Sequence, residues 1–324
     1  MSISVVIATY NRAALLAACL KSLADQHFDS GDEVVVVDNG STDETPRVIE
    51  TARARFPVLV RHMTEPRPGK TEAIAAALAV AAGDVLAFTD DDVMVDAAWL
   101  ATIRRIMRES SAALVGGPVI PRWETPPPPW LRFDPLEYGR LAAPLGLLNY
   151  GSASLELGPR TVLGANMAVR RTSINKVGGF ARNLGKLRGT LLSGEDHELC
   201  QRVQAAGFTA IYHPDLRVSH WVPAERMRAS YSLSWFFWSG ITHATLDADA
   251  PRAVPVLRVP RHFFKRALTS GIRGIGAAVL GRHAHVMDSA TDVAFVAGYA
   301  ARRWNLKGTA NAAGPSPRSA EVQP

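Results

Sequence analysis

The chain has 324 residues, of which 47% are hydrophobic and 20% charged, and its mean hydropathy is +0.02. These values exclude a disordered, collagen-like or coiled-coil protein and suit a globular chain of roughly two domains, at about 150 residues each. The formal net charge of +6 is uneven, because residues 221–324 hold 13 Lys and Arg against 6 Asp and Glu. This basic part indicates either an acidic partner surface, such as phospholipid or nucleic acid, or solvated arginines on surface helices.

The two cysteines, Cys19 and Cys200, fit neither a disulfide framework nor a CxxC metal site. A reducing compartment is therefore expected, and we place the protein in the cytoplasm. Residues 3–9 form an apolar run without a preceding basic segment, so we do not expect a secretory leader. Residues 229–246 lack Asp, Glu, Lys and Arg but hold four Ser and two Thr, which makes them a poor membrane span.

Strand and helix patterns alternate through the first 110 residues. Continuous apolar runs rich in β-branched residues predict buried parallel strands at 3–9, 33–37, 58–63 and 84–89. Apolar residues at helical spacing predict helices at 14–23, 43–55, 71–82 and around 99–107. This alternation indicates βαβ units, a mostly parallel sheet and right-handed crossovers.

The pattern changes after residue 120. Residues 121–135 contain six prolines, which excludes a helix or a central strand and predicts a loop bearing Trp123 and Trp130. Further strands are predicted at 162–170, 208–213 and 216–220. Helices are predicted at 195–206, after Pro223, at 263–280 and at 290–303. The Gly-, Ala-, Pro- and Ser-rich residues 308–324 are expected to be disordered.

Three acidic residues, Asp90, Asp91 and Asp92, follow the predicted strand at 84–89. Adjacent carboxylates at a strand end repel one another and are partly desolvated, a cost that a bound divalent cation removes. In extended backbone the side chains of Asp90 and Asp92 point to the same side, so both can bind one ion. The sequence therefore predicts a metal site, and the alternative is a solvated loop with a helix cap before Val93.

Polar residues also follow the first two strands. Thr9 and Asn11 end the first strand, and Asp38 ends the second, where its carboxylate can accept a hydrogen bond from a base or ribose. The carboxyl ends of parallel strands meet at one edge of a sheet, so these side chains and the acidic triplet should lie together. The alternative for this segment is an Asx turn with a helix cap. Lys70 follows Gly69 at a predicted helix start, where it can meet a phosphate.

Two further features are less specific. The segment GEDHE at 194–198 opens the predicted helix at 195–206, and acidic residues favour helix N-termini through the helix dipole alone. His220 closes a later predicted strand, and histidine is a common metal ligand. Neither GxGxxG nor GxxxxGK[ST] is present, which removes the main support for a dinucleotide or P-loop site.

Taken in chain order, the segments are SVVIATYNR, VVVVDNGSTDET, FTDDDV, LGANMAVRR, GEDHELCQRVQAAGF and VSHW. This ordered set, over about residues 3–220, resembles the family 2 glycosyltransferases, which have a GT-A nucleotide-sugar-binding fold. The resemblance implies an α/β fold with a mostly parallel central sheet flanked by helices, here with a C-terminal helical extension. Processive synthases of that family carry a QxxRW motif after this point, and its absence here indicates transfer of a single sugar.

The resemblance also implies roles for individual residues. It implies a nucleotide-sugar site formed by Thr9, Asn11, Asp38, Lys70, Asp90 and Asp91. It implies a site for Mg²⁺ or Mn²⁺, bridging the diphosphate, formed by Asp90, Asp92 and His220. The ED motif implies that Asp196 is the catalytic base, with Glu195 beside it, and the GANMAVRR segment implies an acceptor-side wall that includes Asn166.

Two expectations concern the acceptor side. Trp123 and Trp130 suit stacking on acceptor sugar rings, and the alternative is that they close the edge of the core. For Asp196, the helix N-terminus and a nearby metal both favour the ionised form, so its pKa is expected to stay below neutrality.

These roles imply inverting transfer of one sugar from a nucleoside diphosphate sugar, with UDP as the expected nucleotide. The expected acceptor is a hydroxyl of a saccharide or of a lipid-linked molecule in polysaccharide and cell-envelope biosynthesis, and nucleic acid is not an expected partner. Two other classes remain: a nucleotidyltransferase acting on sugar phosphates, which would release pyrophosphate, and an inactive sugar-binding protein.

The same resemblance divides the chain. The expected catalytic domain, 1–220, comprises a nucleotide-sugar and metal half (1–120), a Pro-rich acceptor-side insertion (121–160) and an acceptor and base half (161–220). A basic helical extension (221–307) and a tail (308–324) follow.

Basic and apolar residues alternate between positions 258 and 273. The basic residues are Arg258, Arg261, Lys265, Arg266 and Arg273, and the apolar ones are Phe263, Phe264, Leu268 and Ile272. Such an amphipathic helix can lie in an anionic membrane interface, which would suit a lipid-linked acceptor and a position at the inner face of the membrane. The alternative is that the aromatic face packs on the catalytic domain.

The acidic triplet generates the first prediction. EDTA should abolish turnover and added Mn²⁺ or Mg²⁺ should restore it, because the diphosphate and the carboxylates otherwise repel each other. Asp92→Asn should weaken donor binding as well as the rate. A nucleoside diphosphate release assay measures both effects, and full activity in EDTA would contradict the metal role.

Overall fold

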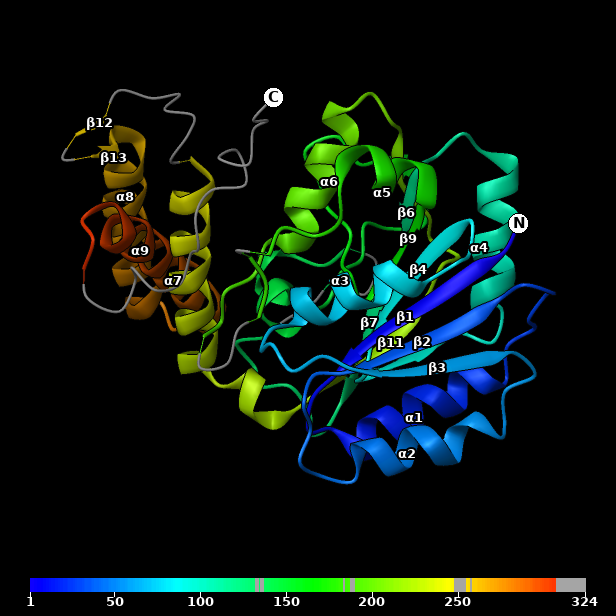
Figure 1. The fold of residues 1–324 in the computed structure, drawn as a ribbon. Helices are drawn as coiled ribbons and strands as arrows, with labels where there is room; N and C mark the ends of the chain where they lie inside the picture. Colours follow the sequence, from blue (N-terminus) through cyan, green and yellow to red (C-terminus); the bar gives the residue numbers. More distant parts are fainter. Residues whose placement is uncertain are drawn as a thin grey trace.

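The computed structural model describes residues 1–131, 134, 137–182, 184–186, 190–247, 255–256 and 258–306, so the predicted tail at 308–324 lies outside it. Its centre is an eight-stranded sheet with the order β3-β2-β1-β4-β9-β6-β10-β8 (Figure 1). The strands are β1 (Ile3–Thr9), β2 (Glu33–Asp38), β3 (Leu59–Thr64), β4 (Val85–Asp90), β6 (Leu114–Gly116), β8 (Leu155–Glu156), β9 (Asn166–Arg170) and β10 (Ala210–Tyr212). β9 runs antiparallel to β4 and β6, and β8 runs antiparallel to β10. The predicted mostly parallel α/β sheet is confirmed.

The strand order reverses beside β1. The chain moves from β1 outward to β2 and β3, and then returns to β4 on the other side of β1. Right-handed crossovers therefore place α1 (Ala13–Ala24) and α2 (Thr45–Arg53) on one face and α3 (Lys70–Val80) on the other, as Figure 1 shows. A reversal of this kind leaves a crevice at the carboxyl ends of β1 and β4, where open α/β sheets bind ligands.

The predicted apolar runs form the core. Ile3, Val5 and Ile7 of β1 are fully buried, as are the valines of β2, because helices cover both faces of these strands. Burying an aliphatic side chain of this size contributes about 1.5–3 kcal/mol. The remaining helices of this part are α4 (Trp99–Glu109), α5 (Arg171–Val177) and α6 (Glu195–Ala205).

A second, three-stranded sheet completes the α/β part of the chain. Its order is β5 (Val93–Val95), β11 (Val218–Val222) and β7 (Val119–Trp123). The loop predicted at 121–135 therefore begins later, because β7 is an edge strand and an edge tolerates Pro121. Antiparallel pairing sets His220 of β11 opposite Val93. Two residues far apart in sequence, His220 and Asp92, are thereby brought to the same place.

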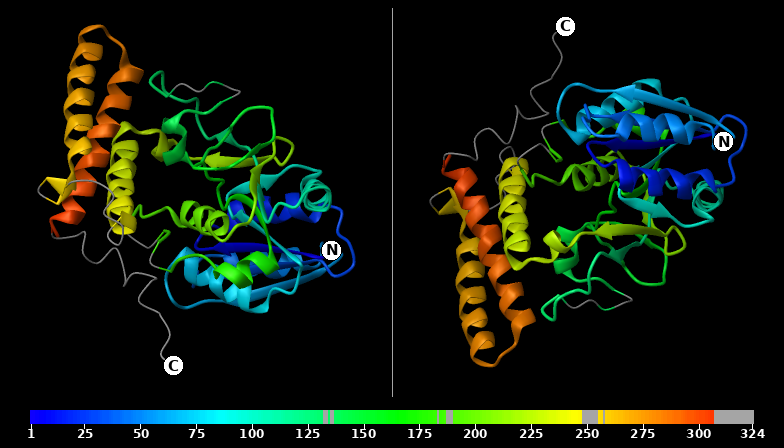
Figure 2. Two further views of the ribbon diagram at one scale, coloured as in Figure 1. Left: turned by 90° about the horizontal axis from the view of Figure 1, so that it is seen from above. Right: turned by 90° about the horizontal axis from the view of Figure 1, so that it is seen from below.

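Helices follow β11. The 3₁₀ helix η2 (Ala224–Met227) comes first and is followed by α7 (Ala229–Leu246), β12 (Pro255–Val256), β13 (Val259–Pro260), α8 (Arg261–Val279) and α9 (His283–Arg303). Another 3₁₀ helix, η1 (Arg140–Leu145), lies earlier in the chain, in the Pro-rich insertion. Figure 2 shows α7 nearest the α/β part, α9 packed on α7, and α8 outermost. Arg140 of η1 ion-pairs with Asp292 of α9, which joins the insertion to these helices. Among the described helices, none combines the length and the apolar character needed to cross a membrane.

Two glycines set the distance between α7 and α9. A Cβ on Gly240 of α7 would lie 2.0 Å from the carbonyl oxygen of Phe295, and a Cβ on Gly298 of α9 would lie 1.8 Å from that of Phe237. Only glycine permits this approach, so the two backbones are in direct contact at the crossing.

Gly298→Ala should therefore destabilise the protein although alanine is the better helix former. Alanine gains about 1 kcal/mol in helix propensity, but the methyl group forces two backbones apart, which typically costs about 1–3 kcal/mol net. Gly271→Ala in α8 is the matched control, since its Cβ would meet nothing within 4 Å. Urea unfolding should show a lower midpoint for Gly298→Ala only; equal midpoints for the two variants would contradict the crossing.

Candidate active site at the carboxyl edge of the sheet

The predicted polar residues meet at the strand ends. In the parallel pairing Thr9 lies beside Asp38, and Ala8 lies beside Asp90. The acidic triplet then divides, because β4 ends at Asp90 and the chain turns at 91–92 before β5. The extended backbone expected through the triplet is therefore wrong, and each carboxylate has its own surroundings.

Arg12 balances the charge of the second and third acids. Its Nη1 lies 3.0 Å from Oδ1 of Asp91 and 2.6 Å from Oδ2 of Asp92. Asp91 also accepts a hydrogen bond of 2.8 Å from the Thr9 hydroxyl. Burial nevertheless raises the pKa of Asp91 to about 6, with Arg12 opposing the shift and Asp92 adding to it. Arg12 was not predicted as a site residue, although it stands inside the first motif.

Asp92 and His220 form a buried pair. Asp92 is 4% exposed and His220 is 3% exposed, and Oδ1 of Asp92 lies 3.3 Å from Nε2 of His220. Burial alone would raise the pKa of Asp92, but His220, Arg12 and Arg226 outweigh it and hold the pKa well below its usual range. Arg226 contributes from 3.7 Å, and sequence reasoning did not identify it.

This pair fits a divalent cation. Oδ1 of Asp92 is buried and, apart from its contact with His220, has no polar partner within the described part of the chain. Two ligands at right angles on one Mg²⁺ or Mn²⁺, each about 2.1 Å away, lie about 3 Å apart, which the observed separation of 3.3 Å approaches. No cluster of three or more His, Cys, Asp or Glu suited to a metal occurs among the described residues. Phosphate oxygens and water would therefore complete the coordination, as is usual for Mg²⁺.

Lys70 connects the acidic triplet to the ED motif. Its Nζ lies 2.5 Å from Oδ1 of Asp90. Burial would lower the pKa of Lys70, but Asp90, Asp196 and Glu195 together raise it, so the ammonium stays charged. Lys186 lies near the same groups, and burial together with Arg226 and Lys70 lowers its pKa to about 8.

The surroundings of Asp196 shift its ionisation. Its pKa is raised to about 7, mainly by burial. The negative charge of Glu195 adds to the rise, and this effect is larger than the lowering by Lys70. In the protein without metal, desolvation therefore outweighs the helix N-terminus, and the expectation for the site with a bound metal stays a prediction. The LGAN segment has glycine at position 164 because a Cβ there would lie only 2.8 Å from Oδ1 of Asp196.

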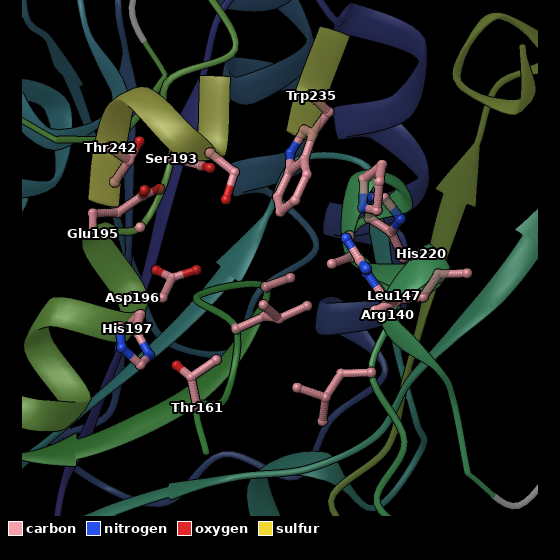
Figure 3. Close-up of a pocket in the computed structure, with 18 of the residues that line it drawn as sticks. Arg140, Leu147, Thr161, Ser193, Glu195, Asp196, His197, His220, Trp235 and Thr242 are labelled. Atoms are coloured by element: carbon pink, nitrogen blue, oxygen red, sulfur yellow. The ribbon is translucent and has the colours of Figure 1, made fainter. Parts of the chain in front are cut away.

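Two cavities meet at this edge. One, of about 560 Å³, lies over the strand ends and is lined by Thr9, Tyr10, Arg12, Asn39, the acidic triplet and Thr190, among others. The other, of about 420 Å³, contains Glu195, Asp196, His197 and His220 and extends to α7 (Figure 3). Lys70, Asp90 and Lys186 line both.

Helix α7 supplies part of the second cavity. Trp235, Ser239, Thr242 and His243 line it, and Figure 3 shows the indole of Trp235 and the side chain of Thr242 at its rim. These residues lie in the C-terminal part, to which the sequence motifs gave no role. An aromatic residue in a helical stripe looks the same in sequence whether it packs or lines a cavity.

Some predicted site residues have local structural partners. Asp38 accepts a 2.8 Å hydrogen bond from the Ser41 amide, and Asn11 accepts one of 2.7 Å from the Thr42 amide. These contacts match the Asx-turn alternative for the segment. Asp38 is 3% exposed, and neither it nor Asn11 lines the first cavity.

The three predicted acceptor residues lie away from the second cavity. Asn166 is fully buried; it accepts a hydrogen bond from the Trp99 indole and donates to the carbonyls of Pro118 and Leu216. Its amide therefore joins β9, α4 and the loops beside them. Trp123 and Trp130 are partly buried against the main core, and neither lines the cavity.

Comparisons with known proteins establish the family of this chain. Residues 4–178, just over half of the chain, match the family model described as glycosyl transferase family 2. The chain therefore belongs to glycosyl transferase family 2, and it is a glycosyltransferase that takes its sugar from a nucleotide sugar.

Relatives span most of the chain. A glucosyl-dolichyl phosphate glucuronosyltransferase of Haloferax volcanii is 26% identical over 78% of this chain and 80% of its own. The succinoglycan biosynthesis protein ExoM of Rhizobium meliloti is 29% identical over 77% and 76%. The solved structure of mannosyltransferase PcManGT from Pyrobaculum calidifontis, in complex with GDP-Man and Mn²⁺, is similar with a TM-score of 0.63 and 19% identity, over 94% of this chain and 88% of that chain.

The raised pKa of Asp196 predicts an effect on stability. The folded value of about 7 lies above an unfolded value of about 3.9, so the folded protein binds this proton more tightly. The resulting stabilisation is complete below about pH 4 and is lost as the pH rises to about 7. When the pH rises from 5 to 8, the wild type should therefore lose about 2 kcal/mol in free energy of unfolding that the Asp196→Asn variant does not lose.

Urea unfolding of metal-free protein at both pH values measures this difference. Glu44→Gln, whose side chain is 71% exposed, is the control and should follow the wild type. If Asp196→Asn also follows the wild type between the two pH values, the proton is not held by Asp196.

Proposed function

We propose that the protein transfers one sugar, with inversion, from a nucleoside diphosphate sugar to a hydroxyl of a saccharide or lipid-linked acceptor. The observation that carries this proposal is the meeting of two cavities at Lys70 and Asp90, with Asp196 on the side of the second cavity only. A transferase needs this division, because donor and acceptor must approach one point from two sides.

The donor belongs in the first cavity. Arg12, Lys70 and Lys186 line it, and three cations suit a diphosphate. Tyr10, 36% exposed at the carboxyl end of β1, can cover a base. UDP is the nucleotide to test first, with GDP second because the similar mannosyltransferase structure contains GDP-Man.

Asp92 and His220 would hold Mg²⁺ or Mn²⁺ beside the diphosphate. A cation bound there would offset the negative charge of the departing nucleoside diphosphate. Asp90 remains paired with Lys70, and this ion pair holds the Lys70 ammonium at the junction of the two cavities. Arg12 and Arg226 keep Asp92 ionised and therefore ready to bind a cation.

The acceptor belongs in the second cavity. Trp235 offers a ring on which a sugar can stack, while Pro144, Leu147 and Leu246 give the cavity an apolar side. The relative that acts on a glucosyl-dolichyl phosphate supports a lipid-linked acceptor, and the succinoglycan relative supports a role in polysaccharide biosynthesis. The two buried, unpaired cysteines suit the cytoplasm.

Asp196 acts as the base in this proposal. Its carboxylate faces the acceptor cavity, and a pKa of about 7 makes it a stronger base than an ordinary carboxylate. Ionised Asp196 accepts the proton of the attacking hydroxyl. Glu195, 5% exposed beside Lys70, keeps that pKa high.

A panel of nucleotide sugars with a saccharide acceptor tests the function. Release of nucleoside diphosphate and an inverted anomeric configuration, read by NMR, are expected. Pyrophosphate release would indicate a nucleotidyltransferase, and retention of configuration would exclude Asp196 as a simple base.

The base assignment predicts a pH profile. At saturating donor, kcat/KM for the acceptor should fall as the pH drops below about 7, because protonated Asp196 cannot accept a proton. Asp196→Asn should lower kcat by about 10²–10⁴-fold and remove this acid limb, with donor affinity little changed.

Glu195→Gln is the matched comparison and should cost less. A near-normal kcat for Asp196→Asn, together with a large loss for Glu195→Gln, would reverse the assignment within the pair. If neither change matters, the base lies elsewhere.

A further inference from the structure

Helix α8 carries a strip of large aliphatic side chains that face solvent. Leu268, Ile272, Ile275 and Val279 are 66%, 63%, 70% and 81% exposed. Their spacing of four, three and four residues places them on one face of the helix. Four such neighbours on one face form a contiguous apolar patch, which soluble surfaces rarely leave in water without a partner.

The strip points away from the rest of the molecule. Ser270 and Ala277, on the opposite face of α8, are buried against the helical layer. Figure 2 shows α8 as the outermost of the C-terminal helices. Phe263 and Phe264, which the sequence grouped with Leu268 and Ile272, instead pack inward against the cluster around Tyr299. The helix therefore has one face for packing and another that no described residue covers.

The charge of α8 indicates the partner. The helix contains Arg261, Lys265, Arg266 and Arg273, and it contains no Asp or Glu. Arg266 is paired with Asp292 at 2.5 Å, on the packed side. The other three are exposed, and none of them forms an ion pair with a described residue. Arg261 and Lys265 precede Leu268 by seven and three residues, so they lie on the same face as the strip.

We propose that this face of α8 docks the protein on an anionic phospholipid bilayer. The aliphatic strip would enter the boundary between headgroups and acyl chains, and Arg261 and Lys265 on the same face would meet lipid phosphates. A second copy of the chain is a poorer partner, because pairing two such faces would bring cations together without an acid to balance them. The proposal stands on exposure and charge alone, so it does not depend on the sugar-transfer reaction.

Vesicle flotation of the full chain tests this. The protein should float with phosphatidylglycerol–phosphatidylcholine vesicles at low salt, and binding should weaken as NaCl rises. Pure phosphatidylcholine vesicles should bind it much less. The double variant Arg261→Gln, Lys265→Gln should lower the partition coefficient about 30-fold, because each basic residue near an anionic surface contributes about 1 kcal/mol to binding.

Ile272→Ser with Ile275→Ser should lower the partition coefficient at least tenfold, since two inserted side chains lose most of their apolar area. Leu59→Ser is the matched control, because Leu59 is 50% exposed on β3, far along the chain from α8. Unfolding midpoints of all variants should match the wild type, which shows that lost binding is not lost folding.

Three results would overturn the proposal. The first is wild-type protein that stays unbound to anionic vesicles at low salt. The second is undiminished binding by the Ile272→Ser, Ile275→Ser variant. The third is a wild-type dimer in light scattering that this variant converts to a monomer, which would assign the strip to a second copy. None of these measurements uses enzymatic activity, so their failure is distinguishable from failure of the proposed reaction.

Discussion

Five carboxylates converge at one edge of the sheet, and balancing their charge is the constraint on which the site depends. They are Asp90, Asp91, Asp92, Glu195 and Asp196, and the cations around them are Arg12, Lys70, Lys186 and Arg226. Burial disfavours every unbalanced charge in such a cluster. The outcome differs from residue to residue: Asp92 remains ionised among cations, whereas Asp196, beside another acid, has a pKa of about 7. In the proposed reaction, one cluster would thus provide both a ligand for a cation and an acceptor for a proton.

Lys70 is central to this balance. It starts α3, the first helix after the strand order reverses, and therefore projects into the crevice between the two halves of the sheet. Its ammonium contacts Asp90, and the charges of Glu195 and Asp196 also act on it, at the place where the two cavities join. In the proposed reaction, this cation would stabilise negative charge that develops on the leaving group.

The sequence predicted the fold well because the signal was strong there. Buried parallel strands read as continuous β-branched runs, and those at 3–9 and 33–37 agree closely with β1 and β2. The carboxyl ends of these strands then locate the polar residues without any knowledge of contacts. The short strands β5, β6 and β7 were not predicted, although the equally short β10 and β11 were. For β7 the reason is Pro121, which counts against a strand in the interior of a sheet but is tolerated at an edge.

The chemistry within the site was less predictable. Arg12, Lys186 and Arg226 come from three distant segments, and no local pattern distinguishes such arginines and lysines from solvated ones. The raised pKa of Asp196 results from burial by the surrounding chain, which the helix start alone does not reveal. Asn166 was expected to face a ligand, yet a buried amide with three protein partners and a ligand-binding amide look alike in sequence.

The C-terminal helices supply part of the lining of the site. One face of α7 lines the cavity that contains Asp196, and α9 packs on α7 through the close backbone approaches at Gly240 and Gly298. The C-terminal helices therefore form one wall of this cavity. The motifs in the first 220 residues consequently leave much of its lining undefined.

Anomalous diffraction from crystals grown with UDP and Mn²⁺ tests the central claim most directly. The claim is that the charge balance leaves Asp92 and His220 free to share one cation. It predicts a manganese peak within about 2.3 Å of Oδ1 of Asp92 and Nε2 of His220, with Lys70 still against Asp90. A peak held by Asp90 and Asp91 without His220, in crystals that contain the nucleotide, would contradict it.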